Sequence, residues 1–263
     1  MIGYIGHEQS LDFYAGATFY VKDELVGFKT IGRLFHALKA GEVVGILMPY
    51  ITGKDGLLED GIARVAHHHF HIEREIVLDV TLSLVAKQPK IEHIKELIVT
   101  YDDYQACYQH IQQLSHVQKK TFVESRYDAL QHVKTENQAA IVSNYQPHAL
   151  DTLKTNLRDY AHNKHVFLLV GQTLKSLGFH NRVMLQVTFE STSRFKVYDV
   201  LHEAVMSNIK VSNISSIHKG STEDQTLLLT LHEQLEHDNM IQLLTLLKQK
   251  AKHVQILGSY FSK

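Results

Sequence analysis

Hydrophobic positions in the first part of the chain alternate between short continuous runs and the spacing of an amphipathic helix. The runs at 2–5 and 43–48 predict buried strands. Between them, Thr30 and Gly41 bracket a predicted helix with apolar residues at positions 31, 34, 35 and 38. This order of strand, helix and strand is typical of a parallel α/β sheet, whose ligands lie beyond the carboxyl ends of the strands.

A long alternating stretch at 72–86 predicts a strand that crosses from this sheet into a second lobe. Further strands are predicted at 94–99, 121–123 and 139–142, and helices at 102–115 and 125–133. The chain then returns to the first lobe through 152–170. Because the chain crosses to a second group of elements and later returns, the pattern predicts two lobes with a cleft between them.

After a predicted linker at 171–180, the C-terminal part has a compact pattern of its own. Its order is strand, helix, strand, strand, helix, strand, which is typical of a ferredoxin-like fold. The predicted elements are 183–189, 194–208, 209–217, 225–231, 235–252 and 254–260.

Composition narrows the classes of function. The chain has 263 residues and is 44% hydrophobic, which is enough for a substantial core. Lys and Arg (27) nearly balance Asp and Glu (28), so no nucleic-acid surface and no polybasic membrane surface are expected. One cysteine, no evident signal peptide and no apolar run of about 18 residues favour a cytoplasmic protein without a membrane span.

Histidine is abundant, with 19 residues in the chain. A cluster at His67, His68, His69 and His71 has spacings that could bind a metal on a helix or on a strand. No carboxylate or cysteine accompanies the cluster, so solvated surface is the favoured interpretation. No metal site and no cofactor are predicted.

The stretch 157–170 begins as a polar turn and continues as an apolar strand, an arrangement that can place side chains at the mouth of a cleft. It resembles the D-Y-x-x-N-x-T-R-F segment of prephenate dehydratases, and four positions match: Asp159, Tyr160, Asn163 and Phe167. His165 stands at the position of the family's catalytic threonine, and Val166 stands at that of the neighbouring arginine.

Other stretches resemble the same family. The loop 49–56 resembles P-I-E-N-S-x-x-G. The family's Glu, Asn and Ser are replaced here by Ile51, Thr52 and Gly53, so Thr52 carries the one remaining hydroxyl group. At the junction that the family writes as S-H-P-Q-A-L-A-Q-C, the hydroxyl of Thr100 is a near match to that of the serine. The run 139–143 matches A-A-I-A-S. Ser10 supplies the hydroxyl of a G-P-x-G-T-F turn, although its place before a helix also predicts a simple helix cap.

The C-terminal residues 257–260 match the L-G-S-Y terminus of the regulatory ACT domain of this family. Two family motifs that help form a phenylalanine site, P-G-A-L and E-S-R-P, are replaced here by R-F-K-V at 194–197 and S-S-I-H at 215–218. Because the glycine that allows close backbone approach and the arginine that offers a charged contact are both replaced, no effector-binding residues are predicted.

The resemblance implies an α/β protein in which a two-lobed, periplasmic-binding-protein-like dehydratase domain at 1–176 precedes a ferredoxin-like (βαββαβ) ACT domain at 182–263. Lobe 1 would comprise about 1–78 and 157–176, and lobe 2 about 79–156. Because ferredoxin-like domains leave a sheet face and edges exposed, a homodimer or tetramer is expected.

The implied activity is prephenate dehydratase, which forms phenylpyruvate, water and carbon dioxide. His165 would act as the catalytic acid, and prephenate or a related aromatic acid would bind Ser10, Thr52, Thr100, Asn163 and Phe167. The alternative is a catalytically inactive relative that binds a small molecule or acts as a regulatory partner subunit. A different enzyme in the same cleft ranks last, because no nucleophile–base pair or phosphate loop supports it.

Overall fold

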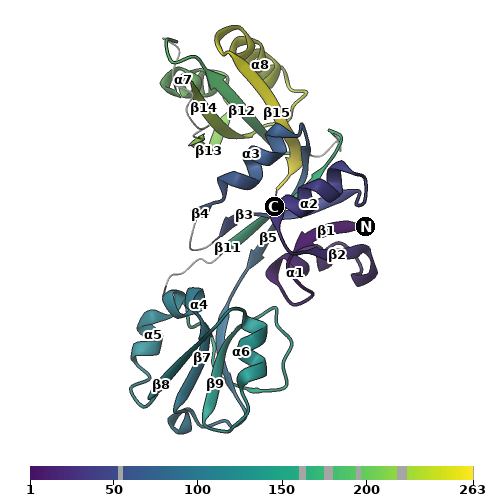
Figure 1. Cartoon of the computed structure of the whole chain (residues 1–263). Coiled ribbons are helices and arrows are strands. Elements are labelled where there is room, and N and C mark those ends of the chain that lie inside the picture. Colours follow the sequence, from purple (N-terminus) through teal and green to yellow (C-terminus); the bar gives the residue numbers. More distant parts are fainter. Residues whose placement is uncertain (53–55, 160–163, 175–179, 194–196, 218–223, 263) are drawn as a thin grey trace.

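The computed structural model describes residues 1–52, 56–159, 164–174, 180–193, 197–217 and 224–262. It is a mixed α/β structure with two sheets, one of ten strands and one of five. The ten-stranded sheet has the order β13-β14-β12-β15-β5-β11-β3-β1-β2, with β4 beside β3, and the five-stranded sheet has the order β10-β6-β9-β7-β8. The five-stranded sheet lies in a separate body at one end of the molecule (Figure 1).

The first part of the ten-stranded sheet contains β1 (Ile2–Ile5), β2 (Leu25–Phe28), β3 (Gly45–Thr52), β4 (Gly56–Leu57), β5 (His71–Asp79) and β11 (Lys164–Gly171). Its helices are α1 (Leu11–Ala17), α2 (Ile31–Lys39) and α3 (Glu59–His67). The predicted cap of α2 is present, since the Thr30 hydroxyl accepts a hydrogen bond from the Arg33 amide. Gly41 follows the helix with a φ of +74°, a conformation that glycine adopts without strain.

The strand predicted at 43–48 ends too early, because β3 continues through Pro49 to Thr52. Proline has no backbone N–H to donate to a ladder, so a central strand tolerates it at an irregularity. The register of β3 against β11 shifts at this point, between the pairs Phe167–Pro49 and Val166–Ile51. This local shift accommodates Pro49 inside the sheet.

The five-stranded body contains β6 (Leu82–Ala86), β7 (Glu96–Thr100), β8 (Lys119–Val123), β9 (Gln138–Ser143) and β10 (Asp151–Lys154). Its helices are α4 (Tyr101–Ala106), α5 (Tyr108–Gln112) and α6 (Arg126–His132). As the alternating stretch predicts, the chain leaves the ten-stranded sheet after β5 and enters the other sheet at β6. Buried Leu78, Val80 and Leu82 belong to one core that continues through this crossing.

The single helix predicted at 102–115 is wrong, because Cys107 interrupts it between α4 and α5. Asp159 stabilises the break from a distant part of the chain. Its amide donates to the carbonyl of Ala106 at 2.9 Å, and its carboxylate accepts from the amide of Gln109 at 2.8 Å. A side chain fifty positions away therefore caps α5, which local periodicity does not reveal.

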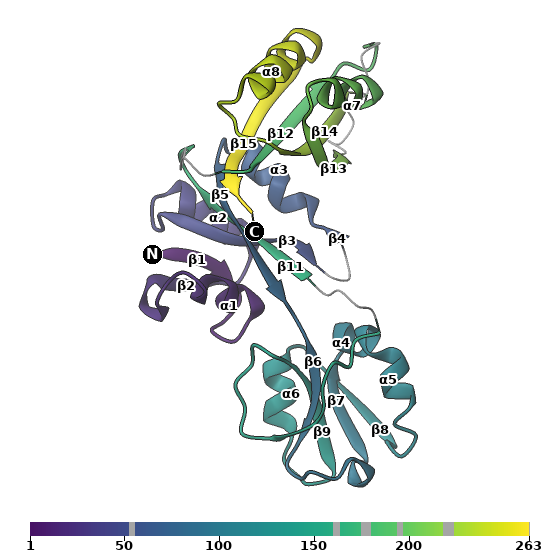
Figure 2. The same ribbon diagram turned by 180° about the vertical axis from the view of Figure 1, so that it is seen from behind.

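The C-terminal unit has the predicted order of β12 (Arg182–Phe189), α7 (Val197–Met206), β13 (Lys210–Ile217), β14 (Gln225–His232), α8 (Asp238–Lys250) and β15 (His253–Phe261). Its four strands are antiparallel to their neighbours within the unit. Both helices lie on one face of these strands, away from the first part of the sheet (Figure 2).

The C-terminal unit and the first part share one sheet, because β15 pairs in parallel with β5. Gly258 lies opposite Ile72, and a Cβ atom at Gly258 would lie only 2.5 Å from the Ile72 carbonyl oxygen. Only glycine allows this approach. Leu257 and Tyr260 on either side are buried in the core of the first part, which gives the L-G-S-Y stretch a structural role.

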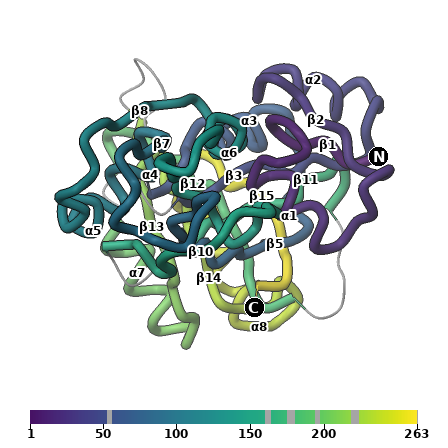
Figure 3. The backbone as a smooth tube through the Cα atoms, turned by 90° about the horizontal axis from the view of Figure 1, so that it is seen from below, coloured from purple at the N-terminus to yellow at the C-terminus, as the bar shows by residue number. Residues whose placement is uncertain are grey.

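Helices α1 and α2 lie to one side of the five-stranded body when the molecule is viewed from below (Figure 3). Within the described residues, none of the helices combines the length and apolar character that a membrane crossing requires.

Candidate functional site

The two sheets direct the ends of several strands toward a shared space. Strands β1 and β3 are parallel, so Gly6 and Thr52 mark the same edge of the ten-stranded sheet, and antiparallel β11 begins there. In the other sheet, β7 and β8 are parallel, as are β7 and β9, so Thr100, Val123 and Ser143 mark one edge. Helix α4, which follows β7, lies on the side of the five-stranded body that faces the other sheet (Figure 1).

Two neighbouring cavities lie between these edges, with volumes of about 120 and 890 Å³. Both are lined from both sheets: by the segment after β1 and by the start of α6. The smaller cavity is lined by His7, Gln9, Ser10, Leu11, Ser125, Arg126, Tyr127, Ser143 and Gln146. The larger is lined by Gly6, His7, Glu8, Gln9, Lys29, Glu124, Ser125, Tyr127 and Asp128. The position agrees with the predicted cleft at the carboxyl ends of the strands.

His7 and Tyr127 face each other across this space. Their ring centroids are 5.9 Å apart with an interplanar angle of 58°, a geometry in the range of favourable aromatic pairs. His7 follows β1 and Tyr127 belongs to α6, so the pair links the two bodies directly. The His7 ring also contacts the amide of Gln9, with a distance of 3.2 Å from Nδ1 to the amide nitrogen.

Ser10, which the sequence places both as a helix cap and as a substrate contact, lines the smaller cavity. Its hydroxyl accepts from the Phe13 amide and donates to the Ile5 carbonyl, both at 3.2 Å. The cap is therefore present. The hydroxyl is already engaged on both its donor and acceptor sides, and a substrate contact for it stays a prediction.

Of the other predicted site residues that the structure describes, none lines either cavity. The hydroxyl of Thr100 accepts from the Asp103 amide and caps α4. Phe167 is 2% exposed and belongs to the core. The ladder between β11 and β3 ends at the pair Val166–Ile51, so His165 and Thr52 are the next residues on these neighbouring strands. Asn163 lies outside the described residues.

Arg126 and Asp103 belong to the candidate site but not to the predicted set of site residues. The Arg126 guanidinium donates two parallel hydrogen bonds to the Asp103 carboxylate, from Nε at 2.7 Å and from Nη2 at 2.6 Å. Burial opposes the positive charge of Arg126, but the carboxylate of Asp103 outweighs burial and raises the pKa of Arg126 above its ordinary value. Arg126 therefore stays charged beside the smaller cavity.

One signal in the sequence could have identified Arg126. It is the first residue of α6, where the helix macrodipole disfavours positive charge. An arginine at such a position indicates a specific anionic partner. Asp103 lies in the first turn of α4, where negative charge is favourable, but it is also 1% exposed and bound to Arg126.

Ser143 and Gln146 are further cavity residues that the predicted site omitted. They are 2% and 5% exposed, and the Ser143 hydroxyl and the Gln146 Nε2 atom have no hydrogen-bond partner among the described residues. The Gln146 carbonyl oxygen accepts from the Ser143 amide at 3.3 Å, which orients the side chain. Ser143 ends the run that matches A-A-I-A-S, so a signal for it was present in the sequence.

The histidine cluster is divided between two elements. Helix α3 ends at His67 and His71 begins β5, so these two residues share neither a helical face nor a strand. The described parts of the chain contain no group of three or more His, Cys, Asp or Glu side chains arranged to hold a metal ion.

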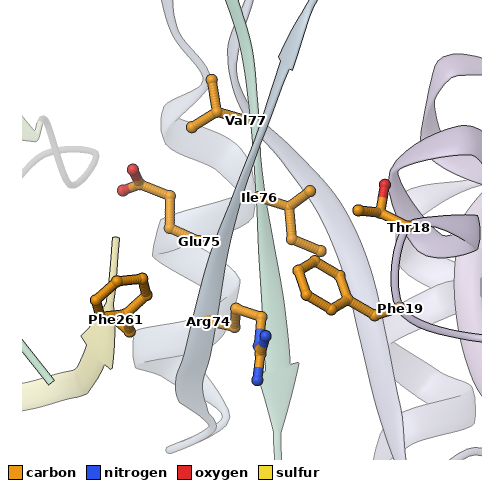
Figure 4. A pocket seen from close by; sticks show the side chains of 7 residues that line it. All are labelled: Thr18, Phe19, Arg74, Glu75, Ile76, Val77 and Phe261. Carbon is orange, nitrogen blue, oxygen red and sulfur yellow. The ribbon is translucent and has the colours of Figure 1, made fainter. Parts of the chain in front are cut away.

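A third cavity, of about 200 Å³, lies beside β5 and has a different character. Figure 4 shows Phe19 and Ile76 on one side of the strand and Glu75 and Phe261 on the other. Its charged groups already have partners, since Arg74 lies 4.5 Å above the Phe19 ring and Glu75 accepts from the Ser262 hydroxyl at 2.6 Å. The surface of this cavity is therefore mainly apolar.

Solved structures similar to this chain include prephenate dehydratases. The enzyme from Staphylococcus aureus subsp. aureus Mu50 has a TM-score of 0.82 and 16% identity, with 98% of this chain and 99% of that chain covered. The enzyme from Arthrobacter aurescens, solved in complex with L-Phe, has a TM-score of 0.80 and 16% identity, with coverages of 99% and 90%. At this identity the structures show a shared fold.

The same fold also occurs in a protein described as GqqA, a novel type of quorum quenching acylase, with a TM-score of 0.82, 16% identity and coverages of 100% and 97%. A search of curated protein sequences gave no match. The family model for prephenate dehydratase matches residues 2–175, which include both edges of the cleft. The chain therefore belongs to the prephenate dehydratase family.

Proposed function

We propose that the chain is a prephenate dehydratase-like enzyme that converts prephenate to phenylpyruvate, water and carbon dioxide in the cleft between its two sheets. The observation that carries the proposal is the 890 Å³ cavity lined from both sheets, in a chain whose family acts on prephenate. A cavity of this size accommodates a small aromatic acid.

The reaction requires one proton at the leaving hydroxyl group. When the ring carboxylate leaves as carbon dioxide, its bonding electrons enter the ring, the protonated hydroxyl leaves as water, and the ring becomes aromatic. His165 is the proposed donor, because an imidazolium is a proton donor near neutral pH and His165 stands at the family's catalytic position. Its place beside Thr52 at the edge of the sheet supports this role.

The proposed domain organisation follows the resemblance. Residues 1–176 form the two-lobed dehydratase domain, and residues 182–263 form an ACT-like regulatory domain, which the antiparallel order β13-β14-β12-β15 supports. We further propose a cytoplasmic homodimer or tetramer. Tyr198, Val205 and Met206 of α7 are 76%, 69% and 70% exposed and would be covered by a second copy. Light scattering of the purified protein tests this assembly.

The decisive assay follows phenylpyruvate formation from prephenate at pH 7.5, with the spontaneous acid-driven reaction subtracted. Loss of a general acid lowers turnover by about 10²- to 10⁴-fold, so His165→Ala is expected to lose activity on that scale. His7→Gln is the matched comparison, because His7 lines both cavities whereas His165 stands at the family position.

If activity survives in His165→Ala but is lost in His7→Gln, the role of proton donor belongs to His7. A folded wild-type protein with no turnover above background would contradict the catalytic proposal. The chain would then be the catalytically inactive relative, with the cleft retained for binding.

A further inference from the structure

The hydroxyl groups of the smaller cavity differ in whether they have partners. The Ser10 hydroxyl both donates and accepts a hydrogen bond. Ser125 caps α6, since its hydroxyl donates to the Asp128 carboxylate at 2.6 Å and accepts from the Asp128 amide at 3.1 Å. The Ser143 hydroxyl has no partner within the described chain, although Ser143 is almost fully buried. A buried hydroxyl without a partner is costly, and such a group indicates a ligand or water.

Gln146 adds a second unpaired donor to the same cavity. Because its carbonyl oxygen accepts from the Ser143 amide, its NH₂ group is directed away from that bond and has no partner in the described structure. Ser143 and Gln146 therefore present an O–H and an N–H₂ group close together at the end of β9.

Arg126 supplies the third donor and the charge. Its Nε and Nη2 atoms bind Asp103 side-on, and its Nη1 atom makes no hydrogen bond to the described residues. Among the described residues, Arg126 is the one Lys or Arg side chain that lines the smaller cavity, and none of the Asp or Glu side chains lines it. The donor set thus favours an anionic acceptor, and the side-on bond to Asp103 keeps the guanidinium in place.

We propose that Arg126, Ser143 and Gln146 form a carboxylate-binding subsite in this cleft. The inference deepens the proposed function, on which it rests for the ligand class of aromatic carboxylic acids. It also explains how the cleft compensates for Val166, which stands where the family has an arginine and is only 9% exposed in an apolar core. The larger cavity shares His7, Gln9, Ser125 and Tyr127 with the smaller cavity that holds the subsite, so the ligand's ring extends into it.

The test uses two probes of nearly the same shape, the anionic 3-phenylpropionate and the neutral 3-phenylpropanamide, in calorimetric titrations of the whole protein at pH 7.5. Wild-type protein is expected to bind the acid about tenfold or more tightly than the amide, because hydrogen bonds to a charged group are the stronger ones. Ser143→Ala and Gln146→Leu are expected to weaken binding of the acid by about tenfold each and binding of the amide much less.

Matched controls come from the C-terminal unit. Ser259 and Gln186 are 3% and 1% exposed and also carry unpaired side-chain atoms, far from the cavity in sequence and in the fold. Ser259→Ala and Gln186→Leu are therefore expected to bind the acid as the wild type does. A third variant, Asp103→Leu with Arg126→Leu, removes the charge without leaving a buried charge unpaired, and it is expected to lose the preference for the acid.

Wild-type protein that binds neither probe, or binds both equally, would overturn the subsite. Unchanged binding in Ser143→Ala and Gln146→Leu would overturn it too. Prephenate turnover on the same preparations separates the two proposals. Turnover without a preference for the acid contradicts the subsite alone, whereas a preference for the acid without turnover supports the subsite and contradicts the catalytic proposal.

Discussion

The two edges that form the cleft use their polar groups differently. On the ten-stranded side, the Ser10 hydroxyl caps α1 by accepting from the Phe13 amide, and it donates to the Ile5 carbonyl. On the five-stranded side, Ser143 and Gln146 have donors without a partner among the described residues, and Arg126 binds Asp103 through two of its three nitrogens. In the proposed site, the first edge contributes structure and the second contributes recognition.

The largest expected effect concerns the ion pair that supports the second edge. Asp103→Ala would leave the guanidinium of Arg126 without its carboxylate partner, which destabilises a fold by about 3–5 kcal/mol when the pair is buried. Urea unfolding followed by circular dichroism measures this loss.

The control for the ion pair is the double variant Asp103→Leu with Arg126→Leu. Replacing a buried pair by apolar side chains is often neutral, so this variant is expected to unfold near the wild-type midpoint. A loss below about 1 kcal/mol in Asp103→Ala would show that the pair is solvated, and would remove the distinction between the two edges.

A smaller effect, dependent on pH, is expected on the first edge at Asp12 of α1. Its Oδ1 atom is buried without a partner in the described structure, and burial raises the pKa of Asp12 from 3.8 to about 7, opposed in part by a hydrogen bond from its own amide. Between these two pKa values the folded protein holds a proton that the unfolded chain has released. The free energy of unfolding therefore falls as pH rises from about 4 to 7.

Asp12→Asn removes this titration. Because the residue as a whole is only partly buried, we expect its contribution to be about 2 kcal/mol across the window, less than full burial would give. Urea unfolding of both proteins at pH 4.5, 6.0 and 7.5 measures it, and the difference between the proteins isolates Asp12 from the histidines. Parallel curves for the two proteins would contradict the assignment.

The smallest expected effects compare two serines in one cavity. Ser10→Ala removes a helix cap and is expected to cost about 1 kcal/mol of the free energy of unfolding. Ser143→Ala removes a buried hydroxyl without a partner, so it is expected to leave stability unchanged or to raise it slightly. Equal losses for both variants would mean that Ser143 is structural as well, and the contrast between the edges would fail.

Local sequence patterns predicted the features of the fold that depend on neighbouring residues. The cap at Thr30, the turn at Gly41 and the order of the C-terminal elements were predicted from such patterns and are present. The failures involve distant partners. The helix break at Cys107 depends on Asp159, and the continuation of β3 through Pro49 depends on the register against β11.

The candidate site divides in the same way. The place of the cleft followed from the carboxyl ends of the strands, and Ser10 at its rim followed from a motif. Arg126 did not follow, because its partner Asp103 lies twenty-three positions earlier and only the fold brings the two together. Whether the hydroxyl of a serine is free or engaged also depends on atoms elsewhere in the fold, so sequence reasoning gave no preference for Ser143 over Ser10.

The pairing of β15 with β5 has a consequence for synthesis on the ribosome. β15 lies inside the ten-stranded sheet, between β12 and β5, and Gly258 fits against Ile72. Residues 71–79 of β5 are translated long before residues 253–261 exist to pair with them. Throughout that interval the nascent chain carries an open strand edge, which is a template for aggregation with other chains. The edge of β5 therefore stays open to other chains until β15 has been synthesised and has paired with it.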